Sequence, residues 1–232
     1  MGTCYTLHYA PDNASMVISI AMDVAGVPYR LQLVDRAAKA QTSPAYLALN
    51  PLGMIPALET PDGTLFETGA ILLWLADRHD GLLPPPGSSA RGDMLKWLFF
   101  TSNSLHAGLR QMFYPEKFIA LDHADALRQG ISARVRNDFQ QIDRVVAQGD
   151  LLGTGAAPAL EIYLCCLLRW ARLYPADFTN DWAQTAGYKH LRAIAERWEA
   201  HPAVLKAIND QGLGPTPFTQ PRLPNPPEGS AT

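Results

Sequence analysis

The segment NPLGMIPALETPDGTLFETGAI, from Asn50 to Ile71, places a proline inside an apolar run that otherwise has the composition of a β-strand. A proline cannot donate a hydrogen bond to a neighbouring strand, so within a sheet it is confined to edges and irregular positions. A cis peptide bond between Ile55 and Pro56 would account for it, because X–Pro bonds are almost the only ones that adopt the cis form at low cost. Such a bond would turn the main chain of Ile55 outward, leaving its N–H and C=O groups free to pair with a peptide-like ligand.

The residues around this segment predict a small α/β domain. Strands are expected at 55–59 and 64–66, joined by the turn TPDG at 60–63, and a helix is expected at 68–79. Earlier in the chain, alternating patterns predict strands at 5–9 and 29–34. A helix is predicted between them at 14–25, with Asn13 as its N-cap and Gly26 just past its end. The expected order is a βαβ unit, a short helix near 43–49, and a ββα unit.

The composition changes at LPPPGSS, residues 83–89, where proline, glycine and serine dominate. We interpret 83–90 as a linker between a domain at 1–82 and an all-helical domain at 91–212. The second domain is predicted to contain helices at 91–114, 122–148, 159–174, 185–198 and 202–209. The tail at 213–232 has six prolines and little to bury, which predicts an extended or disordered segment.

The overall composition narrows the classes of partner. A net charge of −3 and a pI near 6.0, without a run of Lys and Arg, argue against nucleic acid. The three cysteines form neither a disulfide framework nor a metal-ligand pattern, so no metal is expected, and Cys165 and Cys166 are predicted to be buried core thiols. Neither a secretory segment nor a bilayer-spanning stretch is evident, which favours a cytoplasmic protein and argues against membrane binding.

Two motifs resemble those of the cytosolic glutathione transferase family, over residues 5 to about 209. NPLGMIPAL at 50–58 is similar to the family's N-P-x-G-x-[VI]-P-x-L, and ETGAI at 67–71 is similar to its E-[ST]-x-A-I. Each motif alone is weak, but their order, with the hairpin between them and the linker after them, is specific. The resemblance implies an α/β plus all-α fold with an N-terminal thioredoxin-like domain and a C-terminal helical bundle. It also implies glutathione as co-substrate and a homodimer.

The resemblance assigns glutathione contacts to both motifs. In the family the proline is cis and the residue before it pairs with the cysteinyl part of glutathione, which implies this role for Ile55 and Pro56. Thr68, at the start of a helix, is implied to bind the α-carboxylate of the γ-glutamyl end, and Glu67 to offset its ammonium group. A simple helix cap is the alternative for this pair.

A cation for the glycyl carboxylate is expected in the loop after the second strand. Lys39 is the first choice and Arg36 the second. Ordinary solvent-exposed charge is the alternative for both.

The group that activates the thiol is expected near the start of the first helix. A transferase of this type must lower a thiol pKa that is normally about 8.5, using a helix N-terminus and a nearby donor. The local string most resembles the bacterial beta class, but Ala14 stands where that class has cysteine. The remaining donors are ranked Ser15, then Asn13, then Tyr9. An N-cap is the alternative role for Asn13, and a core position is the alternative for Tyr9.

The second substrate is expected to bind against the helical domain. SLH at 104–106 resembles the ELH stretch of the beta class, which implies that His106 faces the electrophile, although a histidine buried in a helical core is the alternative. The other predicted pocket walls, for which core packing is again the alternative, are Met112, Phe113, Tyr114 and Phe118.

The leading hypothesis is therefore a detoxification enzyme that conjugates the glutathione thiolate to a hydrophobic electrophile. A glutathione-dependent peroxidase would need the same thiolate with a different second substrate. A binding or interaction protein that keeps the fold without useful turnover is the third hypothesis, and the unmatched string at 12–15 is its best support.

Overall fold

The computed structural model describes residues 5–149, 152–178, 181–184 and 187–231. The N-terminal part is built on a four-stranded sheet of order β2-β1-β3-β4. Strand β1 (Tyr5–Tyr9) pairs in parallel with β2 (Tyr29–Leu33) and antiparallel with β3 (Ala57–Thr60), and β4 (Gly63–Phe66) forms a hairpin with β3. This topology confirms the predicted α/β part of the fold.

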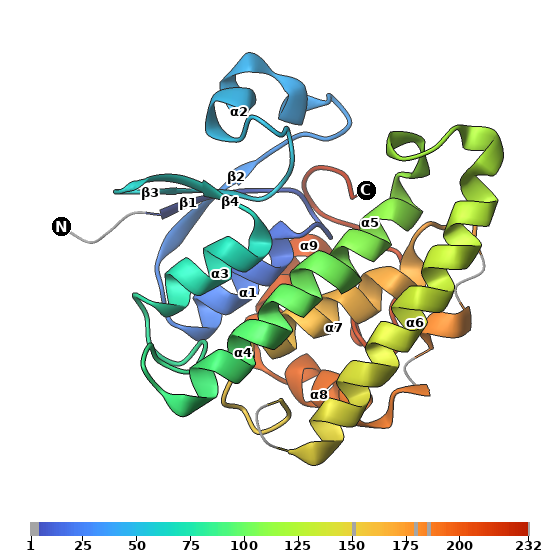
Figure 1. Cartoon of the computed structure of the whole chain (residues 1–232). Coiled ribbons are helices and arrows are strands. Elements are labelled where there is room, and N and C mark those ends of the chain that lie inside the picture. The colour runs from blue at the N-terminus through green and yellow to red at the C-terminus, as the bar shows by residue number, and fades with distance from the viewer. Residues whose placement is uncertain (1–4, 150–151, 179–180, 185–186, 232) are drawn as a thin grey trace.

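Helices cover both faces of the sheet. Figure 1 shows α1 (Ser15–Val24) and α3 (Thr68–Ala76) on the face toward the helical part, and α2 (Pro44–Leu49), which follows the short helix η1 (Ala40–Thr42), on the other face. Successive strand residues point to opposite faces. Leu58 accordingly belongs to the main core, whereas its neighbour Ala57 packs with Tyr46 of α2.

Several predicted boundaries in the first domain shift by a few residues. The strand expected at 55–59 begins at Ala57, so Pro56 precedes the sheet and no ladder hydrogen bond is lost. Helix α1 begins at Ser15 rather than at residue 14, and Gly26, with φ of +64°, follows its end as predicted. The N-cap position is Ala14 rather than the predicted Asn13, whose main-chain oxygen accepts the N–H of Met16 at 2.8 Å.

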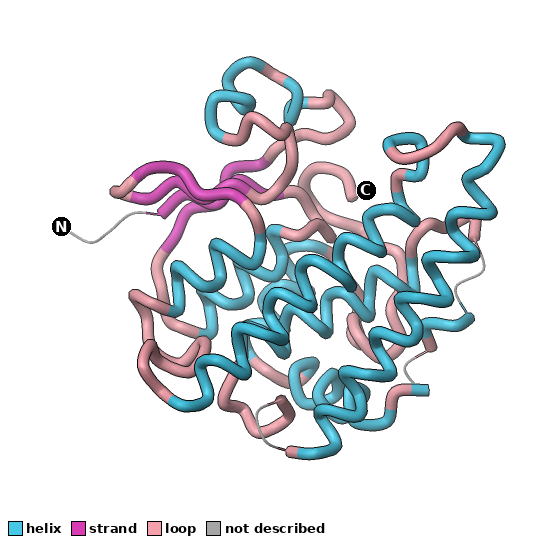
Figure 2. Tube along the Cα trace, viewed as in Figure 1, coloured by secondary structure: helices cyan, strands magenta, loops and turns pink. Residues whose placement is uncertain are grey.

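The helical part begins with a long rod. Helix α4 (Ser89–Phe100) continues through one π-helical segment, η2 (Thr101–His106), into α5 (Ala107–Phe113), close to the single helix expected at 91–114. The chain then forms η3 (Pro115–Lys117), η4 (Leu121–His123) and α6 (Ala124–Gln148). Figure 2 shows that helices make up most of this part of the molecule, with loops between them. The division of the chain at residues 82 and 83–90 stays a prediction.

Helix α7 (Pro158–Leu173) forms the centre of the helical part, and every side chain from Ala159 to Ala171 is buried. The buried set includes Cys165 and Cys166, as predicted. The short helix η5 (Asp181–Ala183), α8 (Lys189–Glu199) and α9 (Pro202–Gln211) follow. Residues 185 and 186 of the helix expected at 185–198 lie outside the described residues, and the observed helix begins at Lys189. No described helix is both long and apolar enough to cross a membrane.

The C-terminal tail corrects one prediction. It has no helix or strand over residues 213–231, but it is packed against the protein rather than trailing from it. Leu213 and Phe218 are fully buried, and the carboxylate of Glu199 accepts the N–H of Phe218 at 2.8 Å. Burial of these two side chains helps to hold the segment in place, because fully buried Leu and Phe side chains each contribute about 1.5–3 kcal/mol.

Candidate functional site

A cavity of about 430 Å³ lies between the sheet domain and the helical part. Its N-terminal wall consists of the loop before α1, the loop before β3 and the start of α3. Its C-terminal wall consists of the η2–α5 rod and α7. The lining includes Asp12, Asn13, Ala14, Arg36, Ile55, Pro56, Glu67, Thr68, Ser102, Asn103, His106, Arg110, Phe113, Tyr114, Lys117, Tyr163, Trp170 and Tyr174.

The peptide bond between Ile55 and Pro56 is cis, as predicted. Both residues line the cavity, and the loop that leads to them is held by side chains. The amide of Asn50 and the hydroxyl of Tyr46 both donate to the main-chain oxygen of Met54, each at 2.7 Å. Within the described residues, no hydrogen bond engages the main chain of Ile55. Its N–H and C=O are therefore available to a ligand in the cavity.

Glu67 and Thr68 stand where β4 ends and α3 begins, and both line the cavity. Glu67 has a φ of +73°, an unfavourable backbone conformation for a residue with a side chain. Thr68 is only 5% exposed and is the first residue of α3, where main-chain N–H groups lack helical partners. This turn thus presents a hydroxyl, free N–H groups and one carboxylate to the same cavity.

Of the three predicted thiol activators, only Asn13 lines the cavity. Its side-chain oxygen accepts the N–H of Ala14 at 2.7 Å, which directs its NH₂ group away from that contact. Ser15 is 1% exposed, and its hydroxyl donates to the main-chain oxygen of Ala10 at 3.1 Å and accepts the N–H of the same residue. The first-ranked donor is therefore turned into its own loop, which does not fit the predicted order.

Tyr9 is also absent from the cavity lining. Its hydroxyl donates to the carboxylate of Glu228 in the tail at 3.2 Å. Burial, followed by the negative charge of Glu228, raises the pKa of Tyr9 to about 12. The alternative given for this residue, a position in the core, matches its buried side chain.

Of the two cations considered in the loop after β2, only Arg36 lines the cavity. Lys39 is exposed and does not line the cavity, whereas Arg36 does. One Nη of Arg36 donates to the hydroxyl of Tyr114 at 3.1 Å. Its other Nη is buried without a hydrogen-bond partner among the described residues. This unpaired donor makes Arg36 better placed than Lys39 to bind an anion in the cavity.

The helical wall contains only some of the predicted residues. His106, Phe113 and Tyr114 line the cavity. Met112 is fully buried in the core, and Phe118 is 46% exposed outside the lining. The residues that face the cavity recur every three or four positions, as one face of a helix requires. The same spacing counted from His106 identifies Asn103 and Arg110, and Ala107 lies four positions after Asn103; the sequence motifs identified none of the three.

The ring of His106 is held in place by Tyr163 of α7. Its Nδ1 lies 2.6 Å from the hydroxyl of Tyr163, which also has a hydrogen bond with the side chain of Thr68. Burial of the ring, and secondarily the charge of Arg110, lowers the pKa of His106 to about 4. Burial, followed by the charge of Glu67, raises the pKa of Tyr163. At neutral pH the wall therefore presents an uncharged imidazole and an uncharged phenol.

Comparison with known proteins gives consistent matches. The glutathione S-transferase N-terminal domain model matches residues 3–77. Glutathione S-transferase GstA from Escherichia coli O157:H7 is 28% identical over 211 residues, which cover 89% of this chain and 98% of that protein. The structure of a sphingomonad glutathione S-transferase complexed with glutathione is 28% identical, with a TM-score of 0.72, and the match covers 90% of this chain and 100% of that chain.

The chain is therefore similar to glutathione transferases over most of its length, and residues 3–77 match their N-terminal domain.

A different relative matches part of the same region. Probable elongation factor 1-gamma 2 from Arabidopsis thaliana is 27% identical over 171 residues, which cover 73% of this chain but only 41% of that protein. Sequences similar to this chain therefore also occur as part of longer proteins with a different description.

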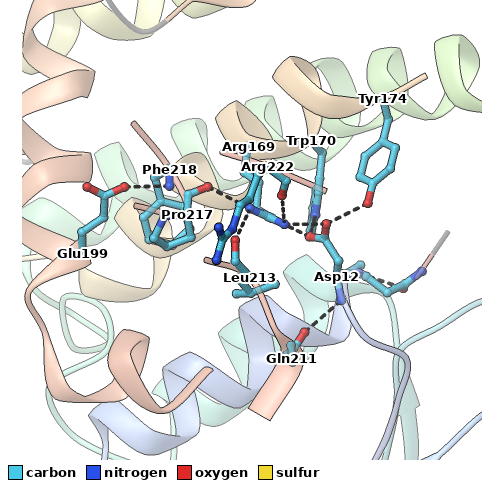
Figure 3. A network of polar contacts seen from close by, with 12 residues as sticks. Asp12, Arg169, Trp170, Tyr174, Glu199, Gln211, Leu213, Pro217, Phe218 and Arg222 are labelled. Carbon is cyan, nitrogen blue, oxygen red and sulfur yellow. Dashed lines mark hydrogen bonds and ion pairs between the residues drawn. The ribbon is translucent and has the colours of Figure 1, made fainter. Parts of the chain in front are cut away.

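A buried network anchors the loop at the start of α1 (Figure 3). Asp12 has a φ of +49° and is 1% exposed. Its carboxylate accepts two hydrogen bonds from Arg169, at 2.8 and 2.9 Å, and one each from Trp170 and Tyr174, both at 2.8 Å. Its main-chain N–H donates to the side chain of Gln211 at 2.9 Å.

The same arginine also holds the tail. Arg169 donates to the main-chain oxygens of Leu213, Pro217 and Arg222. One buried guanidinium therefore ties α7, the tail and the loop that carries Asn13 together (Figure 3). From the sequence alone, Asp12 is indistinguishable from an ordinary turn residue. The one sequence feature that indicates the network is the charged Arg169 inside a mostly apolar helix.

No metal centre accompanies these residues: in the described part of the chain, no group of three or more His, Cys, Asp or Glu is arranged to hold a metal ion.

Proposed function

We propose that the protein binds glutathione in the cavity and conjugates its sulfur to a small electrophile. The observation that carries the proposal is the unengaged main chain of Ile55, which lies in one cavity with the Glu67–Thr68 turn and the partly unpaired guanidinium of Arg36. These groups match a tripeptide that has a peptide unit at its centre and a carboxylate at each end. The sphingomonad relative complexed with glutathione supports this assignment.

Each part of glutathione has a counterpart. The cysteinyl peptide unit pairs with the N–H and C=O of Ile55, as an added strand would. Thr68 and the N-terminus of α3 bind the α-carboxylate of the γ-glutamyl end, and Glu67 offsets its ammonium group. Arg36 binds the glycyl carboxylate. Pro56 lines the cavity beside Ile55 and forms part of the surface against which glutathione packs.

Asn13 and the N-terminus of α1 activate the sulfur. Because the oxygen of the Asn13 amide is engaged by the N–H of Ala14, its NH₂ group is the part free to donate to a thiolate. A donor and the positive end of a helix dipole both favour the charged form of sulfur and lower the thiol pKa. The thiolate then forms a carbon–sulfur bond with the electrophile, and the leaving group departs with its electron pair.

A glutathione-binding protein without useful turnover is the second candidate. Two observations favour it: two of the three predicted activators do not line the cavity, and the match to an elongation factor 1-gamma protein covers 73% of this chain. Intact glutathione contacts without activated sulfur would identify this case. A peroxidase would use the same thiolate, and peroxide turnover would identify it. For either enzyme we expect a homodimer, which light scattering in solution would reveal.

The direct test is conjugation of glutathione to 1-chloro-2,4-dinitrobenzene, with Thr68→Val, Arg36→Gln and Lys39→Gln variants. We expect the KM for glutathione to rise roughly tenfold or more in the first two, since a hydrogen bond to a charged group contributes about 1.5–3 kcal/mol. Lys39→Gln should stay within about twofold of the wild type, because its side chain lies outside the cavity lining. Absence of both turnover and glutathione binding would refute the proposal.

A further inference from the structure

The cavity has an uneven distribution of charge. Three cationic side chains line it, on Arg36, Arg110 and Lys117, whereas the described acidic side chains in the lining are those of Asp12 and Glu67. The carboxylate of Asp12 is already neutralised by Arg169. The protein as a whole has a net charge of −3. The cavity is thus a locally positive site on a negatively charged protein, an arrangement that attracts anions.

These cations lie on two sides of the cavity. Arg36 belongs to the sheet domain, where the proposed function assigns it to glutathione. Arg110 projects from α5 and Lys117 from η3, both on the helical wall, which the same proposal assigns to the second substrate. The inference below rests on that proposed function. It concerns the two cations that glutathione does not use.

Neither cation on the helical wall is paired with an acid among the described residues. The guanidinium of Arg110 lies over the ring of Phe118, with 5.8 Å between its central carbon and the ring centroid. The ammonium of Lys117 lies 4.8 Å from the centroid of Tyr114. Aromatic faces orient a cation without neutralising its charge. Arg110 is also half-buried and lowers the pKa of His106, so its field reaches the centre of the wall.

We propose that the second substrate is an electrophile that carries a carboxylate, and that Arg110 recognises this group. A planar guanidinium forms two parallel hydrogen bonds with a carboxylate. A half-buried and unpaired cation gains more from such a partner than an exposed one does, because less water screens the interaction. Lys117, which is exposed, adds a weaker attraction at the mouth of the cavity.

A suitable probe is 4-chloro-3,5-dinitrobenzoate, with 4-chloro-3,5-dinitrobenzamide as its uncharged counterpart. In both, the glutathione thiolate attacks the ring carbon that bears chlorine, the carbon–sulfur bond forms, and chloride leaves with the electron pair of the carbon–chlorine bond. No other reactant is required. Each catalysed rate is divided by the uncatalysed rate with the same compound, which removes the difference in intrinsic reactivity.

We expect this ratio to be at least tenfold higher for the benzoate than for the benzamide in the wild type. Arg110→Gln should lose most of that preference because its KM for the benzoate rises. Arg110→Lys should retain part of it, Lys117→Gln should lose less, and 0.5 M salt should weaken it. Lys189→Gln removes an exposed lysine of α8 away from the cavity and serves as the control.

Two results would overturn the inference. One is an equal ratio for the two compounds in the wild type. The other is an equal loss with both compounds in Arg110→Gln, which would mean that the arginine serves the thiolate rather than the second substrate. If neither compound turns over, the proposed function fails, and binding of the unreactive 3,5-dinitrobenzoate decides the inference alone. Weaker binding to Arg110→Gln than to wild type supports it, and unchanged binding contradicts it.

Discussion

The side chain of Asn13 has one orientation that satisfies its neighbours, because the N–H of Ala14 needs an acceptor and finds the amide oxygen at 2.7 Å. Replacing Asn13 with Ala should raise the pKa of the bound thiol by about 1–2 units, since one hydrogen bond to a charged group contributes about 1.5–3 kcal/mol. Turnover at pH 6.5 should fall roughly tenfold. The measurement is the pH dependence of kcat/KM.

Ser15→Ala is the matched control for Asn13. It removes a buried hydroxyl that bonds twice to Ala10, so the free energy of unfolding should fall by about 1 kcal/mol or more. The pKa of the bound thiol should not change. A large change in that pKa with Ser15→Ala, and none with Asn13→Ala, would restore the order expected from the sequence.

His106 makes the stability of the fold depend on pH. Its pKa is lowered from 6.5 in the unfolded chain to about 4 in the folded protein. Its contribution is therefore complete above pH 6.5 and is lost as the pH falls toward 4, where the unfolded chain takes up a proton that the folded protein resists. Relative to His106→Gln, the wild type should lose about 1–2 kcal/mol more over this range, after discounting for partial exposure.

Thermal unfolding at pH 7 and pH 4.5 would measure this difference. Parallel losses in the wild type and in His106→Gln would show that the ring does not resist protonation. The same pKa predicts that His106 contributes no inflection to the activity profile between pH 5.5 and 8, since the imidazole stays uncharged there.

At the scale of elements, the decisive contact is the one between α7 and the loop before α1. Arg169→Met would leave the carboxylate of Asp12 buried without its ion-pair partner, although Trp170 and Tyr174 would still donate to it. Loss of one partner of a buried pair typically costs about 3–5 kcal/mol. We therefore expect a loss of this size in urea denaturation, together with weaker glutathione binding because Asn13 follows Asp12 directly.

Arg192→Met in α8 is the control for this variant. Arg192 forms an exposed ion pair with Glu196 at 2.8 Å, and its loss should change the free energy of unfolding by about 0.5 kcal/mol or less. A double-mutant cycle between Asp12→Asn and Arg169→Met should show strong coupling. Additive effects would mean that the two side chains stabilise the protein independently.

The helices and strands that depend on short sequence patterns were predictable from the sequence. Which individual side chains point into the cavity was not. The strand and hairpin pattern and the pair at Glu67–Thr68 depend on neighbours in sequence. Whether Ser15 or Asn13 meets the cavity depends on a hydrogen bond within one loop, which no spacing specifies. Arg36 is distinguished from Lys39 by its place in the cavity lining, where it meets the hydroxyl of Tyr114, 78 residues away in sequence.

At the scale of the whole molecule, the C-terminal tail joins the two parts of the chain. It follows α9 (Figure 1). The N–H of its Phe218 donates to Glu199 of α8, and its Glu228 accepts a hydrogen bond from Tyr9 of β1. Its composition predicted an extended or disordered segment because prolines outnumber apolar side chains. The tail has no helix or strand, and it is held in place because long-range partners, chiefly Arg169 and Glu199, satisfy its main chain.

Truncation after Gly212 should therefore destabilise the protein. It removes Leu213 and Phe218 from the core, and Phe-to-Ala changes alone cost about 3–5 kcal/mol in buried sites. We expect the Tm to fall by roughly 10 °C or more. Truncation after Leu223 keeps both side chains and should lower the Tm by only a few degrees. Equal Tm values for the two truncated proteins would show that the packed part of the tail contributes nothing.

The claim on which the proposed function depends is that the cavity holds glutathione as a thiolate. An ultraviolet titration of glutathione bound to the purified protein, following thiolate absorbance against pH, measures this directly. We predict a pKa at least one unit below that of the free thiol, which is normally about 8.5. An unshifted pKa with bound glutathione would contradict thiolate activation and identify a binding protein, and absence of binding would contradict the site itself.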